Sequence, residues 1–444
     1  MKRMLVLCFA ALLTACGGGG GSSAPEPVAD DSCSITGQKQ FVLDTMRDVY
    51  LWNNLLPADV NIDSFATPGD LLAFLTTFQP VDRFSFLRSA SDEQAFLEGQ
   101  FEGFGFSSRF VAANDLRLSR VFVDSPAWDG GLRRGQQILL INGRTIADIE
   151  ANEGLGAVFG LSPLDFTMRE PDGNEFTVSV SQGIVDIDPV PQFRIIDAGG
   201  GRQVGYVELY TFISSANAQL DEAFNAFRLA GVNEVVLDLR FNGGGLVSTA
   251  ELLGDLLGGF NNDGLIFSET LFNADRTPVV CANAENCIER FSRRGASVDL
   301  SRLAIIASRG TASASELVPN SLEPYVMGDV GVIGTNTFGK PVGQEGFSFC
   351  DQVLRPATFQ TVNADGFGDY FDGLPVDCAA VDDLNVPVGA DEDPNVIAAL
   401  EYLASGGCPV TAIPADPTKP GAQPFVPPRP DLRGAPKREY LDAW

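Results

Sequence analysis

The sequence predicts an α/β protein of several domains, with a small N-terminal helical domain, a β-rich domain and an α/β core built on a mainly parallel sheet. The chain has 444 residues, of which 45% are hydrophobic and 20% charged, so it can bury two or three domain cores. Apolar residues recur at helical spacing near the start, then in short strand-like runs, and then in alternating strand and helix patterns. The last of these patterns favours a parallel sheet covered by helices.

The first residues, "MKRMLVLCFAALLTAC", have the composition of an export signal. Two basic residues precede an apolar run that is too short to span a bilayer as a mature helix. The run ends in Leu-Thr-Ala-Cys, which resembles a bacterial lipobox and implies cleavage before Cys16 and lipid attachment to its thiol. We therefore predict a lipoprotein signal peptide at 1–16 and a Gly- and Ser-rich flexible tether at 17–38. An ordinary signal peptide is the alternative.

Residues 39–97 are predicted to form the helical domain. The stretch "QFVLDTMRDVYLWNNLL" places apolar residues near helical spacing, and "SFATPGDLLAFLTTF" carries Pro68 near the start of a second helix. The stretch "VDRFSFL" then leads into the β-rich domain, which we place at 98–185.

In the β-rich domain, an alternating strand is followed by a short helix after Pro126 and by the apolar strand "QILLI", which Asn142-Gly143 closes as a hairpin turn. Together with "GFGF", the stretch "SPAWDGGLRRGQQILLING" resembles a PDZ domain. The resemblance implies that the backbone around the residues of "GFGF" binds the terminal carboxylate of a peptide that adds a strand to the domain. These residues are Gly103, Phe104, Gly105 and Phe106.

Residues 186–408 form the predicted core, in which "NEVVLDLR" is a buried strand that "FNGGGL" turns into a helix. The strand "RLAIIAS" ends at a group of serines. Residues 409–444 are Pro-rich and are predicted to be an extended or disordered tail.

Composition excludes several classes of function. The net charge is −28 and basic residues do not cluster, so we expect no nucleic-acid partner. The chain has no histidine and its cysteines lack paired CxxC spacing, so we expect no metal or other cofactor. Six cysteines follow Cys16, and an even number in an exported protein indicates disulfides. Cys281 and Cys287 can close a small loop, and the other pairings stay open.

The serines of "TASASELV" raise the question of a nucleophile without a histidine base. A buried lysine can replace histidine, because burial disfavours its charged form and lowers its pKa from the reference value of about 10.4. Lys340 in "TFGKPVGQ" is the candidate. Taken singly, the serine run is more often a helix cap and Lys340 a surface residue. "NGGG" lacks the spacing of a nucleotide site.

In their common order, "LDLRFNGGG", "TASASE" and "TFGKPVGQ" resemble the S41 serine peptidases, the C-terminal processing proteases with a Ser–Lys dyad. The resemblance covers most of the mature chain and implies a ClpP/crotonase-like core. It implies Ser313 as nucleophile, Lys340 as general base and Gln344 as the residue that orients the lysine. The implied oxyanion hole comes from the backbone N–H groups of Gly244 and Ala314.

The match departs from the family pattern in three places. Thr311 replaces the first serine, and Pro341 replaces the glycine that usually follows the lysine. The gap between Ser313 and Lys340 is also slightly longer than usual, and it equals the family pattern when it is measured from Ser315 instead. Ser315 is therefore the rival nucleophile, and Asp238 and Arg240 are predicted to be structural.

The sequence thus predicts a serine endopeptidase of the bacterial cell envelope, held by a lipid anchor at the periplasmic face of the outer membrane. Its expected substrates are unfolded or precursor polypeptides with accessible C-termini, with an adaptor or a second copy of the chain as a further partner. The alternative is a catalytically silent scaffold whose PDZ domain binds peptides.

Overall fold

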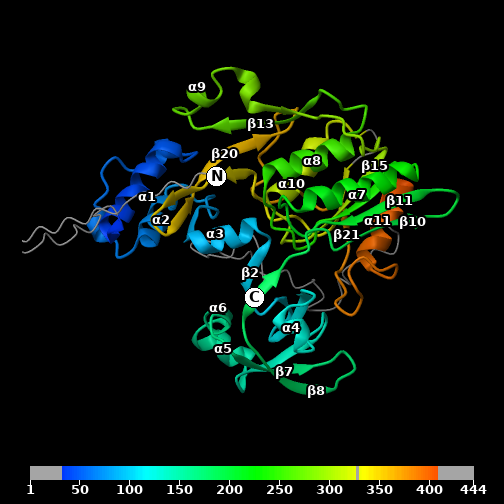
Figure 1. Cartoon of the computed structure of the whole chain (residues 1–444), viewed down its shortest axis with the longest axis horizontal. Coiled ribbons are helices and arrows are strands. Elements are labelled where there is room, and N and C mark those ends of the chain that lie inside the picture. The colour runs from blue at the N-terminus through cyan, green and yellow to red at the C-terminus, as the bar shows by residue number, and fades with distance from the viewer. Residues whose placement is uncertain (1–32, 327–329, 409–444) are drawn as a thin grey trace, which may run out of the picture.

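The computed structural model describes residues 33–326 and 330–408, which form three connected parts (Figure 1). The N-terminal helices lie at one side of the α/β core, and the β-rich part lies below both in this view. The predicted signal peptide with Cys16, most of the tether and the predicted Pro-rich tail lie outside the described residues.

The N-terminal part begins with helix α1 (Ile35–Val49), which packs on α2 (Pro68–Thr76). Thr67 caps α2 by accepting a hydrogen bond from the Asp70 N–H, and the Asp70 side chain accepts one from the Thr67 N–H in return. Short 3₁₀ segments lie between the two helices, at Asn53–Leu55 and Ile62–Ser64.

The region predicted to be a helical domain is not separate from the core. Its residues 86–89 form strand β1 (Phe86–Ser89), which pairs with β19 (Gln352–Arg355). Strand β18 (Phe347–Phe349) completes this small antiparallel sheet, and helix α3 (Ala90–Leu97) follows β1 along the chain. A four-residue strand leaves no helical or strand periodicity to detect, and its partner lies far along the chain.

The β-rich part is a twisted antiparallel sheet with three short helices. Its strand order is β3-β4-β5-β7-β8, with β6 paired to β5. The turn at Asn142-Gly143 has positive φ at both residues and joins β5 to β6, as the sequence predicted. The strands are β3 (Phe106–Ala112), β4 (Asp115–Val121), β5 (Gln137–Ile141), β6 (Arg144–Thr145), β7 (Leu164–Arg169) and β8 (Glu175–Val180). The helices are α4 (Pro126–Asp129), α5 (Ile146–Asn152) and α6 (Leu155–Phe159).

Two strands connect the β-rich part to the remainder of the molecule. Strand β2 (Gln100–Gly103) enters it and β9 (Gly183–Asp186) leaves it, and the two pair as an antiparallel ribbon. Phe101 and Val185 from this ribbon pack in one cluster with Tyr210 and Ile213 of the core.

The core sheet has the order β10-β11-β12-β15-β16-β21, and all of its pairs are parallel except β10 with β11. The predicted mainly parallel sheet is therefore confirmed. Its strands are β10 (Gln192–Asp197), β11 (Gln203–Glu208), β12 (Glu234–Asp238), β15 (Arg302–Ala307), β16 (Val330–Gly334) and β21 (Cys378–Ala379).

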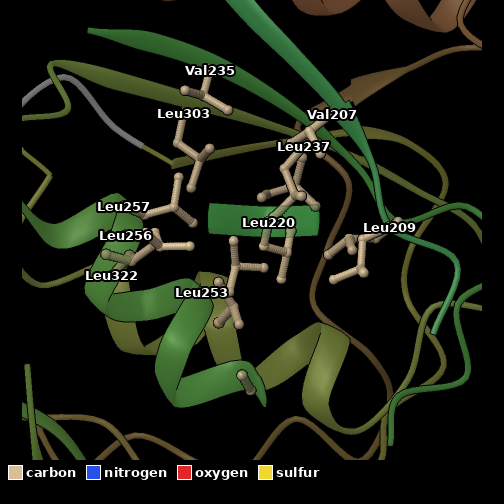
Figure 2. Close-up of a cluster of buried hydrophobic side chains, with 14 of the residues drawn as sticks. Val207, Leu209, Leu220, Val235, Leu237, Leu253, Leu256, Leu257, Leu303 and Leu322 are labelled. Atoms are coloured by element: carbon tan, nitrogen blue, oxygen red, sulfur yellow. The ribbon is translucent and has the colours of Figure 1, made fainter. Parts of the chain in front are cut away.

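Helices cover both faces of the core sheet. Three helices lie on one face, where leucines from α7, α8 and α10 meet strand residues such as Leu237 and Leu303 (Figure 2). The fourth, α11, covers the other face with Tyr402 and Leu403. The helices are α7 (Ala216–Leu229), α8 (Val247–Gly258), α10 (Ala314–Leu322) and α11 (Pro394–Ser405).

A second, antiparallel sheet has the order β14-β13-β20-β17. Helix α9 (Thr277–Val280) and the 3₁₀ segment Ala284–Cys287 follow β13. The strands are β13 (Ile266–Phe272), β14 (Ile288–Arg290), β17 (Val342–Gln344) and β20 (Ala357–Val362).

Among the described residues, three disulfides join cysteines that are 317, 6 and 30 positions apart in the sequence. Cys281–Cys287 forms the small loop that the sequence predicted. Cys33–Cys350 joins the start of α1 to the β18–β19 turn, and Cys378–Cys408 joins β21 to the end of α11. Within the described ranges no helix is both long and apolar enough to cross a bilayer.

Candidate active site

Ser313 lies at the start of helix α10, in the turn that follows the buried strand β15. Its φ of 58° and ψ of −118° are unfavourable for a residue with a side chain, and such strain persists only where the surroundings enforce it. Two hydrogen bonds fix the turn just before it: Thr311 Oγ1 donates to the Leu239 carbonyl at 2.7 Å, and the Ala312 N–H donates to the Asn242 carbonyl at 3.0 Å. The side chain of Ser313 is left half-buried at the helix end.

Ser315, the rival nucleophile, faces the interior. It is fully buried, and its Oγ donates to the Asn242 carbonyl at 3.0 Å. Its hydroxyl therefore stabilises the contact between helix α10 and the glycine loop. Of the two serines, Ser313 is the more accessible.

The glycine loop after β12 packs directly against the serine turn. A Cβ on Gly244 would lie 2.8 Å from the Ser313 Cβ and 3.0 Å from the Ala314 nitrogen, and its φ is 103°. Only glycine allows this approach. The Gly244 N–H donates to Asn242 Oδ1 at 2.9 Å, so its use in an oxyanion hole requires exchange of this bond for the substrate oxygen. Ala314 is the first helical residue, whose N–H has no acceptor within the helix.

Lys340 lies in the loop between β16 and β17, half-buried, and its Nζ donates to Gln344 Oε1 at 2.6 Å. The Gln344 Nε2 donates at 2.8 Å to the carbonyls of Phe84 and Arg355. Because both carbonyls require a donor, the amide is fixed with Oε1 toward the lysine. The structure therefore brings Lys340 and Gln344 together, as the sequence predicted.

Sequence reasoning assigned no role to Glu316, although it is part of the Ser-Ala-Ser-Glu motif. Its fully buried carboxylate accepts four hydrogen bonds. Oε1 accepts from Thr337 Oγ1 at 2.5 Å and from the Gly339 N–H at 2.7 Å. Oε2 accepts from the N–H groups of Ser313 and Lys340, each at 2.8 Å. The backbone nitrogens of Ser313 and Lys340 are thus separated by at most twice that distance.

Burial raises the pKa of the Glu316 carboxyl, and the hydrogen bonds from Thr337 and the three backbone amides oppose that rise. A glutamate one turn into a helix after a serine is a common capping pattern, so its presence alone did not indicate a buried site.

The predicted structural pair Asp238 and Arg240 lies at the end of β12, fully buried beside the glycine loop. Arg240 also pairs with Asp393 at 2.6 Å and with Asp382 at 3.0 Å. Asp382 in turn pairs with Arg134 of the β-rich part at 2.6 Å. The charged network therefore connects the β-rich part to the strand end that carries the glycine loop.

Burial raises the pKa of the Asp382 carboxyl, but the charges of Arg134, Arg109 and Arg240 outweigh it and leave the pKa below its usual range. Away from Asp382, another ion pair between the two parts joins Arg120 to Glu208.

In "GFGF", the two phenylalanines pack in the core of the β-rich part, whereas the two glycines matter for the conformation of the backbone. Phe104 and Phe106 are fully buried in the β-rich part, with ring centroids 6.0 Å apart. Gly105 has a φ of 88°, and a Cβ there would lie 2.1 Å from the Ser125 Cβ. Gly103 ends β2, and β3 is an edge strand of its sheet.

In the part of the chain that the structure describes, no group of three or more Asp, Glu, Cys or His side chains is arranged to hold a metal ion.

The backbone of the strained Ser313 thus lies close to that of Lys340, and a serine beside a base is an arrangement suited to nucleophilic catalysis. The family model for peptidase family S41 matches residues 203–369, and the model for the S41 N-terminal domain matches residues 37–86. The chain therefore belongs to the S41 serine peptidases, which are hydrolases that act on peptide bonds.

Similar proteins in other organisms are named as C-terminal processing proteases. The chain is 25% identical over 299 residues to the carboxyl-terminal-processing protease of Picosynechococcus sp., covering 66% of this chain and 67% of the relative. It is 22% identical over 373 residues to the carboxy-terminal processing protease CtpA of Bacillus subtilis, covering 82% of this chain and 75% of the relative.

Solved structures share the fold. A putative S41 protease from Bacteroides fragilis matches with a TM-score of 0.64 and 25% identity over 82% of this chain and 97% of its own. The photosystem II D1 C-terminal processing protease matches with a TM-score of 0.51 and 21% identity over 84% of this chain and 99% of its own, and this match shows the fold alone.

Proposed function

We propose that this peptidase is a cell-envelope endopeptidase in which Ser313 is the nucleophile and Lys340 the general base. The observation that carries the proposal is the shared acceptor Glu316 Oε2, which binds the backbone of both residues at 2.8 Å. Because one oxygen anchors both segments, the serine turn and the lysine loop stay in a fixed relation, as proton transfer between their side chains requires.

The hydrogen bonds of Gln344 support the role of Lys340. A charged ammonium has only donors, whereas a neutral amine has one lone pair that can accept a proton. Gln344 Oε1 takes one N–H of the amine, and its own orientation is fixed by two carbonyls. The lone pair of the neutral amine can then accept the proton of the Ser313 hydroxyl.

The reaction then proceeds in two halves. Ser313 Oγ attacks the substrate carbonyl carbon while Lys340 takes its proton, and the C–N bond breaks as Lys340 returns that proton to the leaving amine. Water attacks the acyl-enzyme, gives a proton to Lys340 and releases the second product, and Ser313 Oγ recovers its proton. The Ala314 N–H, and the Gly244 N–H once it leaves Asn242, stabilise the oxyanion in both halves.

We propose further that the β-rich part is a PDZ domain that recruits polypeptides by their C-termini. Its edge strand β3 can accept an added strand, and the backbone around Gly103 and Gly105 can bind a carboxylate. The relatives named as carboxyl-terminal-processing proteases agree with such substrates. Unfolded or precursor proteins fit best, because a free chain end must reach the edge strand β3.

The envelope location is proposed from the sequence signal and supported by the disulfides. Three disulfides among the described residues are typical of an oxidising compartment. Cys16 is the proposed lipid attachment site, with the outer membrane facing the periplasm as the location. Growth in radiolabelled palmitate should label the wild-type chain and leave Cys16→Ser unlabelled, and label in both would remove the anchor.

The test of the mechanism is cleavage of an unfolded protein by the mature chain, beside Ser313→Ala and Lys340→Arg. Both variants should lose at least about 10³-fold in kcat/KM, because neither can complete the proton transfer. Arginine is similar in shape but cannot be deprotonated in proteins, so full activity of Lys340→Arg would remove the dyad. A wild-type chain that binds C-terminal peptides but cleaves none would favour the silent scaffold.

A further inference from the structure

Arg83 belongs to the stretch "VDRFSFL", for which the sequence suggested no function. It lies between the N-terminal helices and strand β1, and its guanidinium reaches the loop that carries Lys340. Its Nη2 lies 3.3 Å from the Phe338 carbonyl oxygen and 3.0 Å from those of Gly339 and Phe371. One side chain thus binds three backbone carbonyls in two segments, both more than two hundred positions along the chain.

The contacts of Arg83 and Glu316 fall on the same two peptide groups. In the peptide between Phe338 and Gly339, the carbonyl accepts from Arg83 and the N–H donates to Glu316 Oε1. In the next peptide, the Gly339 carbonyl accepts from Arg83 and the Lys340 N–H donates to Glu316 Oε2. Each peptide plane is therefore held at both ends.

Fixing both ends of a peptide plane fixes the rotations on either side of it. The second plane leads directly into the Lys340 Cα, so its orientation decides where the lysine side chain starts. Gly339 has a φ of 90°, which lies in the region that favours glycine. Because glycine has more backbone conformational freedom than other residues, the loop must lose that freedom to hold one conformation. Arg83 and Glu316 together remove this freedom from opposite sides.

Arg83 is itself held in place by its surroundings. Its guanidinium carbon lies 4.8 Å from the centre of the Phe84 ring and 4.9 Å from that of Phe338. The neighbouring Asp82 is buried and accepts from the Phe84 N–H at 2.9 Å and from Tyr50 Oη at 2.8 Å. The arginine therefore extends from a rigid turn.

We propose that Arg83 is a positioning residue for Lys340: it orients the two peptide planes before the lysine, while Gln344 orients the amine. The N-terminal part thereby completes the active site from outside the parallel sheet. This inference rests on the proposed role of Lys340 as the base. A residue that positions the base acts on proton transfer, so the loss of Arg83 should slow the chemical step and spare substrate binding.

The test compares Arg83→Met, Arg83→Lys and the control Arg47→Met in the full mature chain. Methionine replaces the unbranched stem of the side chain but removes its donors. Arg47 donates to the Ala58 carbonyl within the N-terminal part, away from the lysine loop. We expect Arg83→Met to lower kcat about 10- to 100-fold with KM within about twofold. Arg83→Lys, which retains one donor group, should recover part of kcat, and Arg47→Met should match the wild type.

A second measurement does not depend on activity. Hydrogen exchange at the Gly339 and Lys340 amides should become at least about threefold faster in Arg83→Met and stay unchanged in Arg47→Met. Unchanged exchange together with wild-type kcat would overturn the proposal, and so would a raised KM at constant kcat. If the wild-type chain cleaves nothing, the proposed function fails. Exchange then decides alone whether Arg83 orders the loop.

Discussion

The two sides of the active site are built in different ways. The serine turn follows β15 and contacts the loop after its sheet neighbour β12, through the carbonyls of Leu239 and Asn242. The lysine loop follows β16, but its carbonyls are bound by Arg83 and its amine by Gln344, whose amide is fixed by Phe84. The core sheet thus positions the serine, whereas the lysine depends on contacts from outside that sheet.

The serine and the lysine are positioned by different parts of the fold. Parallel strands end at one edge of a sheet, so the loops that follow β12 and β15 meet without further help. The lysine loop extends past that edge and shares a hydrophobic cluster with the N-terminal helices, which includes Met46, Leu71, Phe84 and Phe338. The serine turn contributes Ala312 to the same cluster. We therefore expect substitutions in the N-terminal part to affect the lysine side more strongly than the serine side.

The largest effect is expected at Glu316, which joins the two sides. In Glu316→Gln one oxygen becomes an NH₂ group that faces donors, so at least one buried N–H group loses its acceptor. We expect kcat/KM to fall by about 10³-fold and the free energy of unfolding by about 3 kcal/mol. Glu323→Gln, at the exposed end of the same helix, is the control. Equal activity of both variants in a cleavage assay would show that the two sides are not coupled.

The next largest effect is expected at Gly339, on the lysine side alone. A Cβ there would lie 2.4 Å from the Phe371 carbonyl oxygen, so Gly339→Ala must shift the loop. We expect kcat to fall about 10- to 100-fold. Gly264→Ala is the matched control, because Gly264 has a φ of 80° but nothing within 4 Å of its added Cβ. If both variants lost kcat to a similar extent, the loss would be due to backbone strain and not to a shift of the lysine loop.

A smaller effect is expected at Ser315, the rival nucleophile. Ser315→Ala removes one buried hydrogen bond to the Asn242 carbonyl, which should cost about 1 kcal/mol in urea unfolding and leave kcat within about threefold of the wild type. Ser313→Ala should be inactive. The reverse pattern would transfer the role of nucleophile to Ser315.

The smallest effect is expected at Glu251 on α8, away from both sides. Burial, followed by repulsion from Glu289 and Asp255, raises the pKa of Glu251 to about 7. The folded state therefore binds a proton more tightly than the unfolded state, whose carboxyl has a pKa near the ordinary value of 4.5. The stability of the wild type should decrease as the pH rises from about 4.5 to about 7.

Glu251→Gln cannot ionise and should escape this loss. We expect it to be about 1 kcal/mol more stable than the wild type at pH 8 and nearly equal at pH 4, a value discounted because the carboxyl stays partly in solvent. Urea unfolding at both pH values measures the difference, and cleavage should be unaffected. A variant that is less stable than the wild type at pH 8 would contradict the raised pKa.

Much of the fold followed from local patterns. The alternation of apolar strands and amphipathic helices predicted the mainly parallel sheet, and Asn142-Gly143 predicted the β5–β6 turn. Strand β1 was not predicted, because four residues carry little periodicity and their partner β19 lies far along the chain. Arg83 also had no predicted role, because its acceptors are backbone carbonyls and any residue type can supply a backbone carbonyl.

Residue types and their spacing were enough to identify the groups that could perform the chemistry: a chain without histidine, a serine before a helix, and a lysine four residues before a glutamine. Three features depended on the packing of distant segments: Ser315 faces the interior, Glu316 binds both segments and Arg83 reaches the lysine loop. Residue type and spacing encode chemical capacity and local conformation. Burial and hydrogen bonds to distant backbone depend on how separate segments pack.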